Sequence, residues 1–339
     1  MSRHALFIAY NLEQPSFRYR MRCLIPALEG QGWTVRVEQF PSGRYGWRVW
    51  ERRALLAWAD ITVLQQVKLS APEAWWLRRY ARRALLDIDD AIYVRKPRQL
   101  GLPAEESAWR RAKFRATCSH MDAVVVGNDV LAQEARRAGR PITILPTAVD
   151  ADRYELSQPA PDQPPTVVWI GSPENLVYLE LVRPALVKLK ARLTNLRLRV
   201  VCSRFPDWPE LNIERVVWSS SAEIAALRSA HVGIMPLTDD AWARGKCAFK
   251  LLQYMAAGLP CVASPVGANV QAVVPGVTGF LADGTPQWEQ ALGLLLSEPQ
   301  KALSMGRAGL AHLNFAYAQS TYINRYSALL TEWADKDTP

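Results

Sequence analysis

The sequence predicts two successive α/β domains, each built on a doubly wound parallel sheet, and three observations support this class. Short apolar runs alternate with amphipathic stretches of about 10 to 15 residues, a spacing typical of parallel strands joined by helices. A proline-rich stretch at residues 157–165 interrupts this alternation. The 339 residues are also enough for two domains of about 150 residues each. We therefore place the first domain at residues 1–150, a linker at 151–165 and the second domain at 166–315.

In the first domain, strands are expected at the apolar runs 5–10, 33–40, 61–65, 84–88, 123–126 and 142–145. Helices are expected between them, near residues 18–31, 72–83, 106–118 and 129–138. The run at 5–10 is far shorter than the roughly 20 residues that span a bilayer. It also lacks the cleavage pattern of a secretory signal. We therefore expect a cytoplasmic chain.

The second domain repeats the pattern after the linker. Strands are expected at 166–171, 196–202, 213–218, 232–236 and 260–264, and helices near 175–192, 221–229 and 246–257. Two Rossmann-like domains of this kind face each other across a cleft, and their ligands bind at the carboxyl ends of the strands. The sequence therefore predicts an active site between the domains.

The basic excess of the chain lies in its first half. Residues 1–150 hold 24 Lys and Arg against 15 Asp and Glu, whereas the remainder holds 17 of each, so the net charge of +9 belongs to the first domain. Much of the excess lies in clusters such as 95–98 and 110–115. Such a surface attracts anionic lipid headgroups, acidic acceptors or nucleic acid. The alternative is that the arginines only solvate helix faces.

The cysteines and histidines indicate no metal site. The five cysteines are scattered without a CxxC pair, which is typical of reduced thiols. None of the four histidines forms a pair at metal-ligand spacing. We therefore expect no metal and no tightly bound cofactor.

The segment 245–260 is the part of the sequence that points most directly to chemistry. Lys246 and Lys250 are four residues apart, so on the predicted helix 246–257 they share one face near its start. Two ammonium groups beside the unpaired amides of a helix N-terminus could hold a diphosphate. The alternative is a solvated amphipathic helix with two surface lysines.

Residues 245–281 resemble the donor-binding signature of the retaining GT-B glycosyltransferases of family 4, the glycosyl transferases group 1. The resemblance lies in QYMAAGLPCVASPVGAN at 253–269 and GVTGFL at 276–281. Looser similarity extends to 16–20, 121–128, 144–150 and 167–172. It implies a GT-B fold whose last helix, at 316–335, packs back on the first domain. It also implies transfer of a sugar from a UDP- or GDP-sugar to an acceptor hydroxyl with retained configuration.

The resemblance also implies roles for individual residues of the second domain. Lys250 and Lys246 would meet the donor phosphates, and Gln253 stands where members usually place a glutamate on the nucleotide ribose. The remaining donor-side residues would be Gly171, Ser172, Gly267, Ala268 and Asn269. This chain departs from the family at 172–175, which lacks the usual arginine and lysine, and at Gly245, where many members have a glutamate.

In the first domain, Asp89 and Asp90 follow the predicted strand 84–88, where related enzymes often have a His-Asp pair. We expect one of them to orient the acceptor hydroxyl or to stabilise positive charge at the anomeric carbon. Aspartates that only cap a turn or helix are the alternative. Arg18 and Arg20 are candidates for holding an anionic acceptor, with solvated loop arginines as the alternative.

Other functions stay open at this point. A sugar-nucleotide epimerase could use the same architecture, a GT-B scaffold could bind without turnover, and the basic half could bind nucleic acid. Because no nucleic-acid-binding motif accompanies the basic residues, we expect no nucleic-acid partner. We instead expect a sugar or lipid-linked acceptor of the cell envelope and a peripheral contact with the inner face of an anionic membrane.

Overall fold

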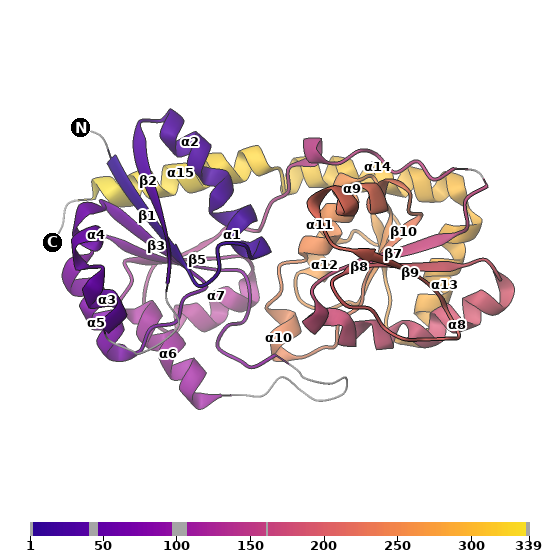
Figure 1. Cartoon of the computed structure of the whole chain (residues 1–339), viewed down its shortest axis with the longest axis horizontal. Helices are drawn as coiled ribbons and strands as arrows, with labels where there is room; N and C mark the ends of the chain where they lie inside the picture. Colours follow the sequence, from indigo (N-terminus) through magenta and orange to yellow (C-terminus); the bar gives the residue numbers. More distant parts are fainter. Residues whose placement is uncertain (1–2, 41–46, 97–106, 161, 337–339) are drawn as a thin grey trace.

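The computed structural model describes residues 3–40, 47–96, 107–160 and 162–336, which form two α/β domains side by side (Figure 1). The described residues of the first domain contain a six-stranded sheet in the order β2-β1-β3-β4-β5-β6. Every neighbouring pair is parallel. The strands are β1 (Arg3–Ala9), β2 (Trp33–Gln39), β3 (Ile61–Gln65), β4 (Ala84–Ile88), β5 (Ala123–Val126) and β6 (Ile142–Ile144). Each was predicted from its apolar run.

Helices connect these strands and cover the sheet. They are α1 (Pro15–Arg20), a 3-10 turn (Arg22–Leu24), α2 (Ile25–Gly30), α3 (Trp47–Glu51), α4 (Arg53–Trp58), α5 (Ala71–Tyr80), α6 (Ala108–Ser119) and α7 (Asp129–Arg136). The single helix predicted near 18–31 is in fact divided. Pro26 lies in the first turn of α2 and has no backbone N–H to continue a preceding helix. The start of the helix predicted near 106 lies at the edge of residues 97–106, which are outside the described residues.

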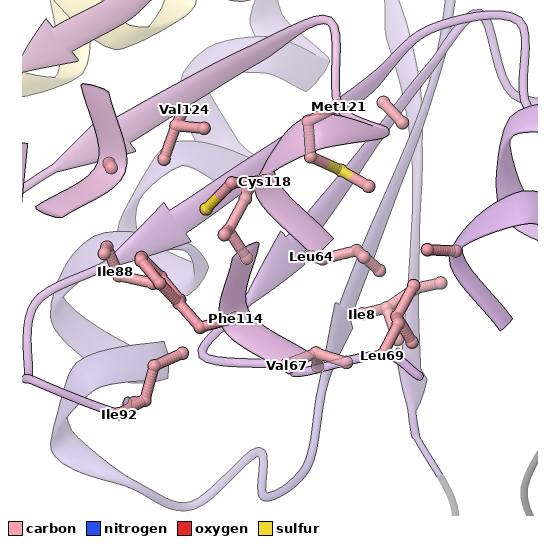
Figure 2. Packing of buried hydrophobic residues seen from close by; sticks show 14 of the residues in the cluster. Ile8, Leu64, Val67, Leu69, Ile88, Ile92, Phe114, Cys118, Met121 and Val124 are labelled. Carbon is pink, nitrogen blue, oxygen red and sulfur yellow. The ribbon is translucent and has the colours of Figure 1, made fainter. Parts of the chain in front are cut away.

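Figure 2 shows how the first core forms between the sheet and α6. Phe114 of α6 is fully buried with Leu64 of β3 and Ile88 of β4. All residues of β3, β4 and β5 are buried, as expected for parallel strands covered on both faces. This packing fixes the carboxyl ends of the strands, where the candidate site lies.

The second domain has another six-stranded parallel sheet among its described residues, in the order β12-β11-β10-β7-β8-β9. Its strands are β7 (Thr166–Ile170), β8 (Arg197–Cys202), β9 (Asn212–Val217), β10 (Val232–Met235), β11 (Cys261–Ala263) and β12 (Gly279–Leu281). The sequence did not predict β12, because its three residues are too short for an apolar run. The two α/β domains with parallel sheets confirm the predicted fold class.

The helices of the second domain correct one sequence prediction. They are α8 (Arg183–Arg192), α9 (Ser220–Arg228), α10 (Ala241–Arg244), α11 (Phe249–Ala256), α12 (Asn269–Ala272), α13 (Gly284–Ser297) and α14 (Pro299–Ala316), with a 3-10 segment at Pro173–Leu181. The helix predicted from 246 starts only at Phe249, because Ala248 has a left-handed backbone with φ of 53°. Lys246 therefore lies in the turn before α11, and the prediction of two lysines on one helix is wrong.

The last helix, α15 (Gln319–Asp335), leaves the second domain and lies along the first (Figure 1). Tyr322, Tyr326 and Leu330 are buried in the first domain's core. Asp335 accepts two hydrogen bonds from Arg3, at 3.1 and 2.7 Å. The end of the chain therefore ties the two domains together. No helix in the described ranges is long and apolar enough to cross a membrane.

Candidate active site

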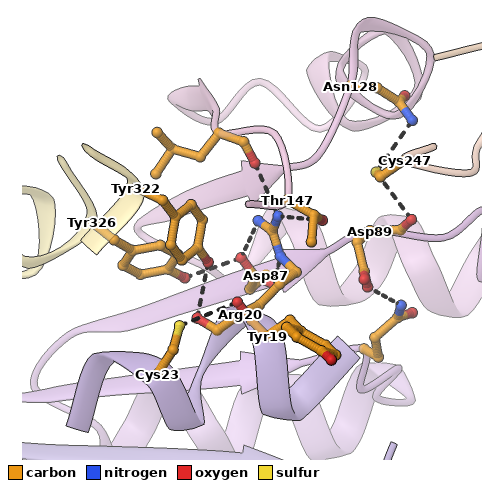
Figure 3. Close-up of polar contacts among 12 residues, drawn as sticks. Tyr19, Arg20, Cys23, Asp87, Asp89, Asn128, Thr147, Cys247, Tyr322 and Tyr326 are labelled. Atoms are coloured by element: carbon orange, nitrogen blue, oxygen red, sulfur yellow. Dashed lines mark hydrogen bonds and ion pairs between the residues drawn. The ribbon is translucent and has the colours of Figure 1, made fainter. Parts of the chain in front are cut away.

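The domains meet where β4 and β5 end and the turn between α10 and α11 begins (Figure 3). Asn128, directly after β5, caps α7 and donates from Nδ2 to the carbonyl oxygens of Gly245 and Lys246, at 3.0 and 3.1 Å. The Cys247 thiol donates to the carbonyl oxygen of Asp89 at 3.2 Å. A side chain of the first domain thus fixes the backbone that carries Lys246.

Asp89 lies half-buried at the end of β4, as predicted. Its carboxylate accepts a hydrogen bond from the Gln66 side chain. Gln66 itself follows β3 with φ of 58°, a costly conformation for a residue other than glycine. Burial raises the pKa of Asp89 to about 7, and the neighbouring charge of Asp90 acts in the same direction. Asp89 can therefore change protonation near neutral pH.

Asp90 faces a cavity of about 780 Å³ between the domains. Its negative charge also raises the pKa of both Lys246 and Lys250, against the lowering effect of their burial. The aspartates of the first domain and the lysines of the second therefore share one electrostatic environment. The structure brings these predicted residues together.

Lys250, in the first turn of α11, lies where the strand order of the second sheet reverses between β7 and β10. Its Cε is 3.1 Å from where a Cβ on Gly171 would stand, and its Nζ is 5.7 Å from the ring centre of Trp169. Burial lowers the pKa of Lys250 to about 7, and repulsion from Lys246 acts in the same direction. A dianionic ligand would restore its charge.

Lys246 connects to the loop after β7. Its Nζ donates to Oδ1 of Asn175 at 3.2 Å, and Nδ2 of Asn175 donates to Oγ of Ser172 at 2.9 Å. Burial lowers the pKa of Lys246 below its usual value. Gly171, Ser172 and the two lysines therefore surround one position at the carboxyl end of β7, where doubly wound sheets bind phosphate groups.

Gly245 explains one departure from the family pattern. A Cβ at this position would lie 2.6 Å from the Cβ of Ala91 and 2.9 Å from its backbone nitrogen. The two chain segments can pass this closely only because residue 245 has no side chain. A glutamate at 245 does not fit in this arrangement of the domains.

The loop with Gly267, Ala268 and Asn269 lies beside the end of α10. A Cβ on Gly267, whose φ is 54°, would lie 2.6 Å from the carbonyl oxygen of Arg244. The Asn269 side chain is buried and donates to the carbonyl oxygen of Ser264 at 3.1 Å. The backbone N–H of Asn269 donates to the carbonyl oxygen of Val266. The side-chain amide and the backbone N–H of Asn269 therefore stabilise the conformation of this loop.

Gln253 is buried in α11, three residues after Lys250. Its Nε2 donates to Glu223 Oε1 at 2.6 Å and to the Tyr154 hydroxyl at 3.1 Å. Glu223 also accepts from the indole nitrogen of Trp218 at 2.8 Å. The sequence did not single out Glu223 or Trp218, because their separation from Gln253 along the chain hides the contact.

Arg20 requires a correction. Its guanidinium is completely buried and donates to both carboxylate oxygens of Asp87 at 2.7 Å (Figure 3). The Leu145 carbonyl and the Thr147 hydroxyl accept further hydrogen bonds from it, and Tyr326 donates to Asp87. Because no part of its side chain is accessible, Arg20 is a structural residue and does not contact an acceptor as predicted.

Arg18 remains at the domain junction. Its guanidinium carbon lies 4.9 Å from the ring centre of Trp218, which belongs to the second domain. Nearby, the ring centres of Tyr19 and Phe249 lie 4.4 Å apart. These contacts connect α1 to the second domain.

Several basic clusters of the first domain are ion-paired internally. Arg111, Arg115 and Arg137 surround Glu134, at 2.9, 3.6 and 3.1 Å. Arg82 pairs with Asp60 at 2.6 Å. The excess positive charge is therefore less freely available than the sequence suggested. In the described ranges, no group of three or more His, Cys, Asp and Glu could hold a metal ion.

Comparison with known proteins assigns the second domain. Residues 164–298 match the family model described as Glycosyl transferases group 1. A D-inositol 3-phosphate glycosyltransferase of Nocardia farcinica is 34% identical over 87 residues, which are 24% of this chain and 19% of that protein. Its namesake in Segniliparus rotundus is 38% identical over 63 residues, or 18% of this chain and 14% of that protein. The matches therefore span less than a fifth of these curated relatives.

Solved structures resemble nearly the whole chain. A glycosyltransferase from Rickettsia africae has a TM-score of 0.76 at 12% identity, covering 99% of this chain and 100% of the other. Sucrose-phosphate synthase from Thermosynechococcus elongatus has a TM-score of 0.74 at 15% identity, covering 97% and 99%. Anabaena HepE in complex with UDP and glucose has a TM-score of 0.68 at 12% identity, covering 96% and 99%. The chain therefore has the GT-B fold of these structures, and residues 164–298 of its second domain are similar to the glycosyl transferases group 1.

Proposed function

We propose that this chain is a glycosyltransferase that moves a sugar from a nucleoside-diphosphate sugar to an acceptor hydroxyl. The observation that carries the proposal is the pair of half-buried lysines, Lys246 and Lys250, beside Gly171 at the switch point of the second sheet. The aspartates of the first domain lie across the same junction. The family match over residues 164–298 supports the same function and favours neither an epimerase nor a nucleic-acid-binding protein.

The donor binds with its diphosphate against the two lysines and the Gly171–Ser172 turn. Anabaena HepE, which shares this fold, was solved in complex with UDP and glucose, and this supports a UDP-sugar as the donor, although the residues also suit a GDP-sugar. Gln253 and the loop from Gly267 to Asn269 support the ribose and sugar side. The hydrogen bond that Gln253 donates to Glu223 holds its side chain in one orientation.

In the transfer step, the bond between the anomeric carbon and the β-phosphate oxygen breaks, and the acceptor oxygen bonds to that carbon with retained configuration. Lys246 and Lys250 stabilise the negative charge that develops on the departing diphosphate. Asp90 orients the acceptor hydroxyl in the cavity, and Asp89, with its pKa near 7, stabilises positive charge at the anomeric carbon when ionised. The acceptor proton leaves with the diphosphate. No step requires a metal.

The acceptor belongs to the cell envelope, as a polysaccharide or lipid-linked sugar, and the chain works at the inner face of a membrane. Trp75 of α5 supports this proposal because 55% of its side chain is exposed beside Arg78 and Arg79. Changing Trp75 to Ser should lower binding to vesicles that contain phosphatidylglycerol. Unchanged binding by this variant would remove the membrane contact but not the transferase.

A thermal-shift screen tests the donor proposal directly. UDP, GDP, ADP and their glucose conjugates are each added to the purified chain, since a bound ligand raises the melting temperature by mass action. At least one of these diphosphates should raise it, and the same ligand should have a smaller effect on Lys250→Met. If none stabilises the chain at millimolar concentration, the proposed function is wrong.

A further inference from the structure

The interdomain cavity has an unusual charge balance on its first-domain side. Four cationic residues line it, Lys68, Arg95, Lys96 and Arg110, against the two carboxylates of Asp90 and Glu174. Glu174 is held by hydrogen bonds with Ser172 and the backbone, which lower its pKa and keep it ionised. Asp90 also interacts with the two lysines of the second domain, Lys246 and Lys250.

Lys68 is the central cation of this group. It lies half-buried after β3, and among the described residues no carboxylate is close enough to raise its pKa. Arg110 and Lys113, on successive turns of α6, repel its charge. Burial and this repulsion lower the pKa of Lys68 to about 8. A half-buried cation among other cations is costly unless an anion joins them.

The cavity also joins this cationic end to the donor side. Trp242 of α10 lines it, with Lys96 Nζ 5.1 Å and Lys246 Nζ 5.5 Å from its ring centre. Trp109 of α6 provides a second aromatic wall, and 60% of its side chain is exposed. Lys68, Asp90 and both tryptophans line the same cavity, so a molecule with a sugar-like body and an anionic group can contact them together.

We propose that the acceptor carries a phosphate group and that Lys68 and Arg110 bind this group, which places the acceptor hydroxyl near Asp90. The inference rests on the proposed transferase function and deepens it, because it names the chemistry of the acceptor. The phosphate belongs either to a soluble sugar phosphate or to a lipid headgroup. Both sources present the same tetrahedral anion to the two side chains.

The test uses the full chain saturated with UDP, so that phosphate probes do not occupy the donor lysines. Inorganic phosphate, glucose 6-phosphate and glucose are titrated calorimetrically into the wild type, Lys68→Met and Arg110→Met. Lys301→Met is the control, because Lys301 is exposed on α14. The phosphorylated probes should bind the wild type more tightly than glucose. The ratio of the dissociation constant of glucose to that of each phosphorylated probe should fall at least about tenfold in Lys68→Met and in Arg110→Met. The ratio should stay unchanged in Lys301→Met.

Two further arms separate the phosphate sources and the underlying function. If vesicles of phosphatidic acid in phosphatidylcholine displace glucose 6-phosphate and pure phosphatidylcholine vesicles do not, the phosphate is a lipid headgroup. If neither displaces it, the phosphate belongs to a soluble sugar phosphate, and the lipid-linked acceptor proposed above is excluded. The affinity for UDP should be equal in the wild type and Lys68→Met. Two outcomes overturn the inference, provided that UDP still binds in a Lys250-dependent manner. Either the phosphate probes bind the wild type no more tightly than glucose does, or they bind Lys68→Met as tightly as the wild type. Loss of UDP binding in the wild type would instead overturn the proposed function.

Discussion

Replacement of Lys250 by Met tests the donor site most directly, because it removes the ammonium group and keeps most of the side-chain volume. A charge-assisted hydrogen bond to a phosphate oxygen contributes about 1.5 to 3 kcal/mol. The pKa of Lys250 in the free protein is about 7, so at pH 7 about half of the molecules must first bind a proton, which costs about 0.4 kcal/mol. The net loss in Lys250→Met is therefore about 1 to 2.5 kcal/mol. The dissociation constant for UDP should rise about 5-fold to about 70-fold.

The pH dependence makes this prediction specific to Lys250. At pH 8.5, protonating a group of pKa about 7 costs about 2 kcal/mol. The dissociation constants of the wild type and Lys250→Met for UDP should therefore differ by less than about fivefold at this pH. Calorimetry in buffers of different ionisation enthalpy should show proton uptake on UDP binding by the wild type at pH 7. This uptake should be smaller in Lys250→Met.

Folding stability provides a second readout of the same residue. The pKa of Lys250 is lowered from 10.5 to about 7 on folding, so between these values the unfolded chain binds more protons than the folded chain. Without donor, this lysine makes the free energy of unfolding rise with pH across that window, by up to about 1.4 kcal/mol per pH unit. Lys250→Met should lack this contribution and should be no less stable than the wild type at pH 7.

Lys301→Met is the matched control, because Lys301 is exposed on α14 and pairs with Glu298, the residue just before that helix, at 3.7 Å. It should bind UDP like the wild type at both pH values. If Lys250→Met also binds UDP like the wild type at pH 7, the donor site does not lie at the switch point of the second sheet, and our reasoning is refuted.

Three further changes test the rest of the site. Asp90→Asn should lower transfer by about 100-fold or more and retain UDP binding, and a transfer rate equal to the wild type would exclude a role in orienting the acceptor. Gly245→Ala places a methyl group within 2.6 Å of the Ala91 side chain, so the two domains should move apart and turnover should fall at least about tenfold. Small-angle scattering can detect this movement as a larger radius of gyration. Arg20→Met leaves the Asp87 carboxylate buried without its partner and should lower the free energy of unfolding in urea by about 3 to 5 kcal/mol. A loss of acceptor affinity without a loss of stability would instead support the prediction that Arg20 holds an anionic acceptor.

The sequence by itself determined the fold class, and it singled out the segment that we propose binds the donor. Parallel strands that are buried on both faces appear as continuous apolar runs, so β3, β4 and β5 were visible without tertiary information. The segment around Lys250 was visible because its chemistry and its family resemblance lie in consecutive residues. The sequence did not predict β12 because a strand of three residues is too short to show an apolar run. It is recognised as a strand only by its pairing with β11.

The tertiary structure decided which charged groups are available. Arg18 and Arg20 look equivalent in sequence, yet Arg20 meets a carboxylate 67 residues away and is completely buried, whereas Arg18 packs on the other domain. Lys68 showed no pattern in sequence, and only the packing of α6 against the end of β3 places Arg110 and Lys113 beside it. Burial, ion pairing and pKa depend on distances between residues far apart in the chain, and local periodicity carries no information about those distances.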